Sequence, residues 1–160
     1  MGLAWPAMSK KKLFFYVGVF LLSVAAGFTF FRSSNSGTLS SAPELDWRAL
    51  GEMDYISGAA SEDLKKLDGK TVKIPGFMVP LEDNQKLVSQ FLLVPSPQAC
   101  IHVPPPPPNQ MVLIDMDPAS KTETASGPIW VYGKFEITSK RHMYGESSFH
   151  MVGFKVEPYR

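Results

Sequence analysis

Hydrophobic and polar positions alternate with a period of two over much of the second half of the chain. The clearest run covers residues 128–137, where Ile129, Val131 and Phe135 alternate with polar or larger aromatic residues. Such alternation predicts a strand with one buried face. The same pattern and the turn residues that bound it predict four further strands, at residues 70–79, 87–94, 110–116 and 147–156.

The last predicted strand, residues 147–156, carries a histidine among apolar side chains. Val152, Phe154 and Val156 fall on one face of it, and His150 falls on that same face. A lone histidine on an apolar strand face is usually a buried residue with satisfied hydrogen bonds. We expect that role for His150.

Five short strands within about 90 residues, with no helical crossovers between them, predict a small antiparallel barrel. Five strands suit a barrel of the oligonucleotide/oligosaccharide-binding (OB) type, and a five-stranded open sandwich is the alternative. Gly76, Gly133 and Gly153 lie inside predicted strands, where a missing side chain permits sharp coiling or a bulge. The expected fold class is therefore mainly β, an OB-like five-stranded antiparallel barrel.

Two short helices are predicted ahead of the barrel. Residues 44–50 follow Pro43, which suits a first helical turn, and their apolar residues recur at helical spacing. Ser61 is a candidate N-cap of a second helix, and Gly69 is its candidate stop.

The N-terminal region contains an uncharged apolar stretch at residues 13–31, preceded by Lys10, Lys11 and Lys12. As a helix this stretch would span about 28 Å, close to the ~30 Å hydrocarbon core of a bilayer. The basic residues before it predict a cytoplasmic N-terminus and an exported remainder. A signal anchor is favoured over a cleaved signal peptide because the stretch is long and aromatic residues follow its small residues.

These features predict four segments. Residues 1–12 form a cytoplasmic basic N-terminus, residues 13–31 a transmembrane signal anchor, residues 32–42 a polar linker and residues 43–160 an exported barrel domain. The expected location is the inner membrane, with the C-terminal domain in the periplasm.

The net charge of +1 conceals an asymmetry along the chain. Residues 1–31 hold three lysines and no acidic residue, which leaves 13 Lys and Arg against 15 Asp and Glu, a net charge of −2, in residues 32–160. A folded domain that binds nucleic acid carries a strongly basic surface. The composition therefore argues against a nucleic-acid partner.

The chain has one cysteine, so no intramolecular disulfide forms. Cys100 lies two residues before His102, and in an extended chain the two side chains point to the same side. Thiolate and imidazole are zinc ligands, but two ligands do not complete a tetrahedral site. His142 is the candidate third ligand, with His150 or an acidic residue as alternatives. A buried structural cysteine, or a reactive thiol with His102 as its base, are the other interpretations of the pair.

A proline run follows directly, and its residues are Pro104, Pro105, Pro106, Pro107 and Pro108, followed by Asn109 and Gln110. Prolines in series form a polyproline II rod without amide donors. Such a rod serves either as a strut on its own domain or as a docking ligand for a partner's aromatic groove. Its position between two predicted strands favours the strut, whose carbonyls the two amide side chains could bind.

The sequence around this run resembles the signature of a bacterial family of envelope proteins of unknown function, many of them lipoproteins. Residues 99–110 read Ala-Cys-Ile-His-Val, five prolines, Asn and Gln. Three more segments match elements of that family: Gly-Phe-Met-Val-Pro-Leu-Glu at 76–82, Phe-Leu-Leu-Val-Pro at 91–95 and Pro-Ile-Trp-Val-Tyr-Gly at 128–133. The chain departs from the family at Gln98, where many members have glycine, and in having an apolar anchor in place of a lipidated cysteine.

The likeness covers residues 44–158 and implies no role for any single residue. Members of the family are often encoded near components of ATP-binding-cassette transporters, some of them linked to metal handling. We therefore expect a membrane-anchored, exported binding or accessory module that assists such a transport system, with zinc as its candidate cofactor. The alternatives are a thiol-dependent redox or acyl-transfer enzyme and a purely structural protein-interaction module. No catalytic residue is assigned.

Overall fold

The computed structural model describes residue 39 and residues 41–82, 87–97 and 105–159. The chain divides into two units, Met1–Ser40 and Ser41–Arg160, and every strand lies in the second. The predicted cytoplasmic segment and membrane anchor, and most of the linker, fall outside the described residues. Within the part of the chain that is described, no helix is long and apolar enough to cross a membrane.

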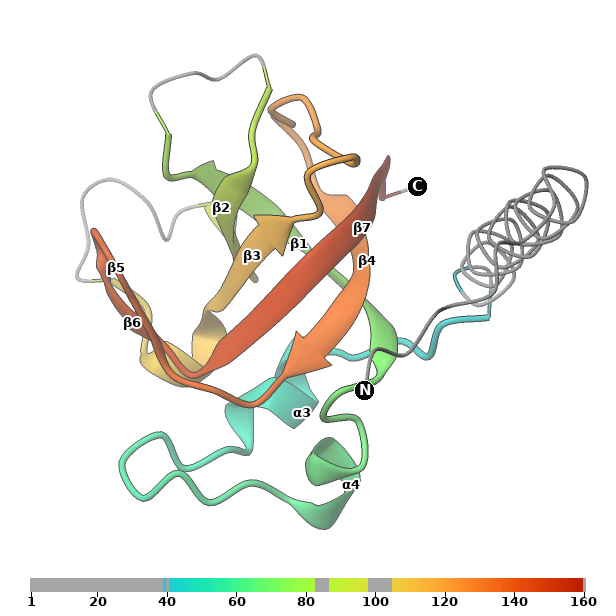
Figure 1. Cartoon of the computed structure of the whole chain (residues 1–160). Helices are drawn as coiled ribbons and strands as arrows, with labels where there is room; N and C mark the ends of the chain where they lie inside the picture. Colours follow the sequence, from blue (N-terminus) through green and yellow to red (C-terminus); the bar gives the residue numbers. More distant parts are fainter. Residues whose placement is uncertain (1–38, 40, 83–86, 98–104, 160) are drawn as a thin grey trace, which may run out of the picture. The chain divides into compact units, whose positions relative to one another are not determined.

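Five strands form a closed barrel (Figure 1). They are β1 Thr71–Pro80, β2 Gln90–Val94, β3 Val112–Met116, β4 Ile129–Glu136 and β7 Phe149–Pro158. The order around the barrel is β1-β2-β3-β7-β4, and β4 closes the ring by pairing with β1. Each strand overlaps its predicted range, so the mainly β class is confirmed, and the open sandwich is excluded by the closure.

The expectation of a wholly antiparallel barrel is wrong. Four neighbouring pairs are antiparallel, but β3 and β7 run in the same direction. The reason is geometric, because strand directions cannot alternate all the way around a closed ring with an odd number of strands. One parallel pair is therefore required, and it falls where β7 inserts between β3 and β4.

An irregularity in β7 changes which of its side chains face inward. Lys155 lies opposite Tyr132 and Gly153 lies opposite Gly133, so Phe154 is an extra residue in the ladder. An inserted residue of this kind is a β-bulge, and it shifts the alternation of faces by one. Gly133 permits the close approach, since a Cβ there would lie 2.3 Å from the carbonyl oxygen of Val152.

The bulge corrects the predicted faces of β7. Before it, the inward residues are Phe149 and Met151, whereas His150 points outward on the opposite face. After it, Val156 packs against the interior cluster. Uninterrupted alternation had placed His150 and Val156 on one face, and the extra residue makes that assignment wrong.

Two apolar clusters hold the unit together. The larger fills the barrel and includes the stacked rings of Phe135 and Phe149, whose centroids are 5.4 Å apart. The smaller lies outside the barrel wall on β1, β2 and β3, and its buried members are Leu92, Val94, Met111 and Leu113. Strand β1 contributes to both, with Val72, Ile74 and Met78 inward and Phe77 and Val79 outward.

Two short helices cover one end of the barrel (Figure 1). Helix α3, Trp47–Gly51, begins at Asp46, whose side chain accepts a hydrogen bond from the backbone N–H of Ala49. Helix α4, Glu62–Lys65, begins at the predicted cap Ser61. Both helices are confirmed, although α4 ends earlier than its predicted stop at Gly69. Each helix buries a leucine of the interior cluster, Leu50 in α3 and Leu64 in α4.

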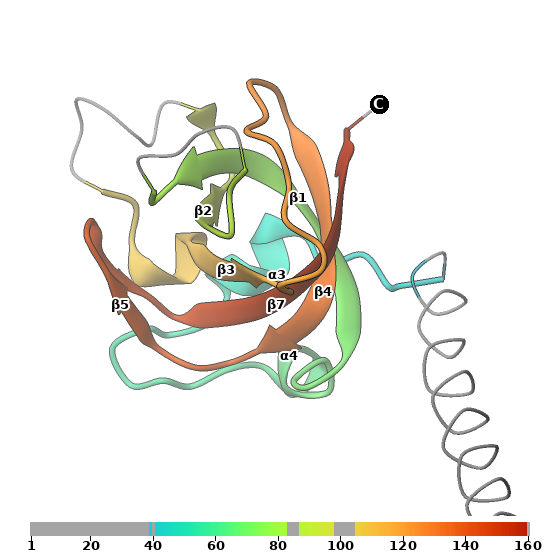
Figure 2. The same ribbon diagram turned by 45° about the horizontal axis from the view of Figure 1, so that its top comes forward.

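Three further elements were not predicted. Among the described strands, β5 Lys140–His142 and β6 Gly145–Ser147 pair with each other alone and form a hairpin beside the barrel (Figure 2). The end of the proline run forms a single turn of 3-10 helix, η2 Pro108–Gln110. This turn connects the proline run to β3.

Candidate functional site

The middle of β1 is a seam, where pairing passes from one edge of the strand to the other. Its first six residues pair with β4 on one edge, and its last four pair with β2 on the other edge. The change of partner falls between Gly76 and Phe77. Below the change, residues 43–45 take the place of β2 on the free edge of β1. Leu45 donates to the carbonyl of Lys73 at 2.9 Å, and Lys73 donates to the carbonyl of Pro43 at 3.0 Å.

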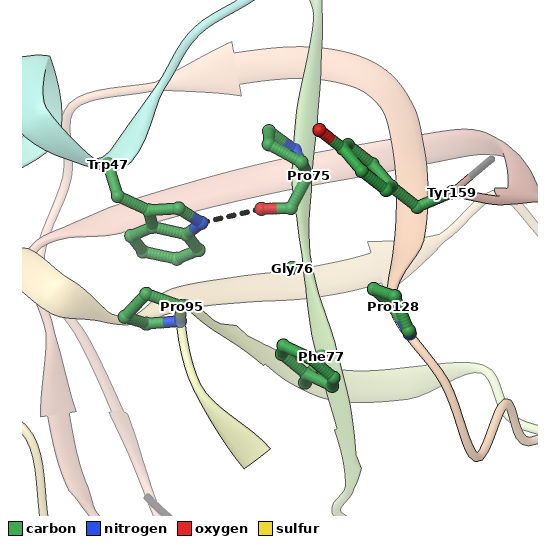
Figure 3. Close-up of a pocket in the computed structure, with 7 residues that line it drawn as sticks. All are labelled: Trp47, Pro75, Gly76, Phe77, Pro95, Pro128 and Tyr159. Carbon is green, nitrogen blue, oxygen red and sulfur yellow. Dashed lines mark hydrogen bonds between the residues drawn. The ribbon is translucent and has the colours of Figure 1, made fainter.

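The side chain of Trp47 lies in the gap between that segment and β2. Its indole Nε1 donates to the carbonyl oxygen of Pro75 (Figure 3). Pro75 has no N–H of its own, so its carbonyl is the one backbone hydrogen-bonding group that the residue offers. The indole supplies the donor that a neighbouring strand would otherwise have provided.

A shallow groove with a volume of about 310 Å³ lies at this seam. We call it the seam groove, and its lining residues are Trp47, Pro75, Gly76, Phe77, Pro95, Pro128 and Tyr159 (Figure 3). Three aromatic rings and three proline rings dominate this surface. Pro95 follows the end of β2 and Pro128 precedes the start of β4, so neither strand end presents a backbone N–H of these residues to the groove.

The groove residue Tyr159 contacts Trp130, which is flanked by an ion pair. The centroids of the two aromatic rings are 5.0 Å apart. The ammonium group of Lys73 lies 4.2 Å from the centre of the Trp130 ring and 3.4 Å from a carboxylate oxygen of Glu44. The backbone N–H of Tyr159 donates to the carbonyl of Pro128, which fixes the aromatic wall. The described lining of the groove thus carries no charged side chain.

The end of the proline motif holds the helix that carries Trp47. Asn109 is buried, and its amide donates to the carbonyls of Gly51 and Met53 at 3.1 and 2.9 Å. The amide of Gln110 donates to the carbonyl of Trp47 at 3.4 Å. A Cβ at Gly51 would lie 2.7 Å from that amide nitrogen. The prediction that the two amides bind carbonyls of the proline rod is wrong, because they bind carbonyls in and just after α3.

The proline run itself is partly described. Pro104 falls outside the described residues, as do the predicted ligands Cys100 and His102. Pro107 has φ −63° and ψ 154°, which are polyproline II angles, and Pro105 and Pro107 are exposed. The rod therefore ends in η2, and none of the prolines at 105–108 lines the seam groove.

The third predicted metal ligand, His142, is the last residue of β5. Its Nε2 is buried and has no hydrogen-bond partner, while its Nδ1 accepts from the backbone N–H of Tyr144 at 3.3 Å. Burial lowers the pKa of His142, which favours the neutral form that binds metals. Metal binding through Nε2 would move the proton to Nδ1 and break the bond from Tyr144. Among the described residues, no group of three His, Cys, Asp or Glu side chains could hold a metal ion.

The other candidate ligand, His150, joins three barrel strands through its side chain. Its Nε2 lies 2.8 Å from a carboxylate oxygen of Asp115 on β3, and its Nδ1 lies 3.4 Å from Glu136 on β4. Gln90 on β2 donates to the other oxygen of Asp115 at 2.7 Å. His150 is thus a buried histidine with both nitrogens partnered, as predicted, although on the outer face.

The seam groove was not predicted from the sequence. No functional role was predicted for Trp47, Phe77 or Tyr159. These residues come from α3, β1 and the chain after β7, and a strand that changes partners leaves no periodic signal. Pro95 was predicted only to follow the strand at 87–94, and Pro128 only to begin the strand at 128–137.

Comparisons with known proteins identify the family. The chain matches, over residues 49–158, the family model described as "Protein of unknown function (DUF3299)". It is also similar to the crystal structure of a DUF3299 family protein (PA4066) from Pseudomonas aeruginosa PAO1, with 33% identity and a TM-score of 0.59 over 74% of this chain and 97% of that chain. No curated protein matches. The chain therefore belongs to the DUF3299 family, whose function is unknown.

Proposed function

We propose that the barrel is an OB-like binding module and that its ligand site is the seam groove. In chain order, the barrel strands are arranged first, second, third, fifth, fourth, with the third and fifth parallel. This arrangement supports the five-stranded Greek-key class to which OB barrels belong. A fold by itself does not assign a ligand, because ligand binding depends on the side chains of the site.

The face that OB barrels commonly use is already covered in this chain. That face is the outer side of the second and third strands. Here the residues on it, Leu92, Val94, Met111 and Leu113, are between 2% and 4% exposed. A ligand would have to displace their covering, which supports a site elsewhere on the barrel.

The single observation that carries the proposal is the uncharged aromatic and proline lining of the seam groove. Rings held in place by backbone bonds, such as Trp47 on Pro75, present flat surfaces with little loss of conformational freedom on binding. The volume of about 310 Å³ lies at the lower end of the range for small-ligand sites. Apart from Tyr159, the described lining residues carry no ionisable side chain, which supports binding of an uncharged apolar group rather than acid–base chemistry.

Nuclear magnetic resonance of the unit Ser41–Arg160 tests this proposal. The indole N–H of Trp47 reports on the groove, and the probes are an uncharged proline-rich peptide and a set of apolar ring fragments. We expect saturable shifts at Trp47 and Tyr159 with at least one probe. Tyr159→Ala should weaken that binding several-fold. Tyr144→Ala is the matched control, because the two tyrosines are 49% and 43% exposed. Absence of groove shifts with every probe, or equal losses in both variants, would overturn the proposal.

We propose the membrane anchor and the role beside a transporter from other observations. The apolar stretch at residues 13–31 behind three lysines supports an inner-membrane anchor with the barrel in the periplasm. The gene neighbourhood of the resembling family supports an accessory role beside an ATP-binding-cassette transporter. A phosphatase fused after residue 160 should be active if the domain is exported, and a cytoplasmic reporter at the same point should be inactive. The reverse result would exclude the proposed orientation.

Zinc binding through Cys100, His102 and His142 is a second proposed function. The observation that favours it is the buried Nε2 of His142 without a hydrogen-bond partner, since a buried polar atom usually has one. Metal content of the purified protein tests it. We expect zinc in the wild-type protein, and its loss in Cys100→Ser and in His142→Gln but not in His150→Gln. A metal content at background level in the wild-type protein would exclude the site.

A further inference from the structure

The β5–β6 hairpin projects beyond the barrel strands (Figures 1 and 2). Among the described strands, its two strands pair with each other alone, and β6 also contacts η2. A two-stranded ribbon is marginally stable by itself in water. Gly145, with φ +134°, allows the tight turn that follows Tyr144. The turn at residues 143–144 therefore lies at the projecting end of the hairpin.

The turn exposes two large side chains. Met143 is 72% exposed and Tyr144 is 43% exposed. We call these two residues the hairpin tip. Single exposed apolar residues are common on protein surfaces, but here two neighbours share one projecting turn.

Two cations precede the hairpin tip on β5. Lys140 and Arg141 are exposed, and neither side chain forms an ion pair with any described residue. Glu146 lies opposite Arg141 in the ladder and offsets part of this charge. The side chains of the hairpin thus keep a positive balance next to its apolar turn.

We propose that the hairpin docks on the anionic surface of a lipid bilayer. Met143 and Tyr144 enter the interface, and Lys140 and Arg141 lie over the headgroup phosphates. Tyrosine favours the membrane–water interface, where its ring is apolar and its hydroxyl remains hydrated. Basic side chains beside an apolar insertion add attraction to anionic lipids.

The shape of the hairpin favours a bilayer over an acidic protein. A stable protein–protein interface buries roughly 800 Å² on each partner, which a single convex turn does not supply. A bilayer surface accepts a projecting tip without a complementary cavity. Attraction between exposed charges falls with added salt, so the docking is expected to be salt-sensitive.

Nuclear magnetic resonance in the presence of lipid vesicles tests this proposal. The protein is the unit Ser41–Arg160, which contains the whole barrel and both apolar clusters. One set of vesicles contains phosphatidylcholine alone, and the other also contains phosphatidylglycerol. We expect signal loss centred on residues 140–147 with phosphatidylglycerol, much less with phosphatidylcholine, and recovery when salt is added. Equal signal loss with both vesicles, loss centred on another surface, or no loss at all would overturn the proposal.

Variants distinguish binding by the hairpin from attraction by the net charge of the protein. Lys140→Ser combined with Arg141→Ser should reduce the bound fraction several-fold, and Met143→Ser combined with Tyr144→Ser should do the same without changing the charge. Lys70→Ser combined with Lys121→Ser is the matched control, because both lysines are exposed and the net charge changes equally. If the control loses as much binding as the hairpin variants, overall charge explains the attraction and the proposal fails.

Discussion

Trp47 donates its indole N–H to the carbonyl of Pro75, a residue 28 positions further along the chain. The bond joins helix α3 to the point where β1 exchanges one partner strand for another. The Trp47 side chain, which forms one wall of the seam groove, is thereby hydrogen-bonded to the backbone of the barrel. The position of Trp47 depends in turn on Asn109 and Gln110, which bind the backbone of the same helix.

Replacing Trp47 by phenylalanine tests the bond to Pro75. Trp47→Phe keeps an aromatic ring but removes the N–H, so the carbonyl loses its donor. We expect a loss of about 1 kcal/mol in the free energy of unfolding, the usual net value of one hydrogen bond. Urea denaturation measures it. Trp130→Phe is the control, because its contacts are through the ring face, and an equal loss there would show that ring size rather than the bond matters.

Asn109 should matter more than Gln110. Asn109→Ala removes two hydrogen bonds from a buried side chain and leaves two carbonyls to be resatisfied, so we expect a loss of about 1–3 kcal/mol. Gln110→Ala removes one long bond from a less buried side chain, and its effect should be smaller. Urea denaturation of both variants measures the order. The reverse order would contradict the proposed role of Asn109 in holding α3.

Gly133 is predicted to tolerate no side chain. In Gly133→Ala the new Cβ would meet the carbonyl oxygen of Val152 at 2.3 Å and the Met151 side chain at 2.6 Å. Backbone would have to move, so we expect a loss of about 1–3 kcal/mol or more. Thermal unfolding of Gly127→Ala is the comparison, since nothing lies within 4 Å of a Cβ there. Similar melting temperatures for the two variants would refute the close packing at the bulge.

Stability should fall in acid partly through Glu136. Its bond from Lys134, and then that from His150, lower the pKa of Glu136 in the folded protein. A lowered folded pKa means that this stabilisation is complete above the unfolded value, ~4.3, and is lost as pH falls through the folded pKa. Denaturant unfolding at a series of pH values from neutral to acid measures the slope. We expect Glu136→Gln to flatten it and the exposed control Glu123→Gln to leave it unchanged.

The strands were predictable from the sequence because their signal is local. Alternation of apolar and polar residues, clearest in β4, predicted the strands. Glycines inside β1, β4 and β7 predicted where the strands are irregular. Neither signal depends on tertiary contacts. The parallel pair could also have been foreseen, since five strands in a closed ring require one. Its placement between β3 and β7 depends on pairing between distant segments, which alternation does not encode.

The candidate site was not predictable, because it also depends on contacts between distant segments of the chain. Trp47, Phe77 and Tyr159 meet only after β1 has exchanged partners, and each by itself resembles an ordinary packing residue. The bulge at Phe154 reversed the predicted face of His150, because one unpaired residue inverts every side chain beyond it. The amides of Asn109 and Gln110 were correctly expected to bind carbonyls, but their partners lie more than fifty residues away in the chain.

Closure of the barrel has a consequence for the rate at which the chain folds. The ring is complete only when β1 pairs with β4, for example with Thr71 opposite Lys134. Before that pair forms, the long segment between the two strands has to become compact. Topologies dominated by such distant pairings fold on the order of milliseconds to seconds. Trp130 lies opposite Pro75 across that closing ladder, so its fluorescence in a stopped-flow experiment should report the late, slow formation of the ring.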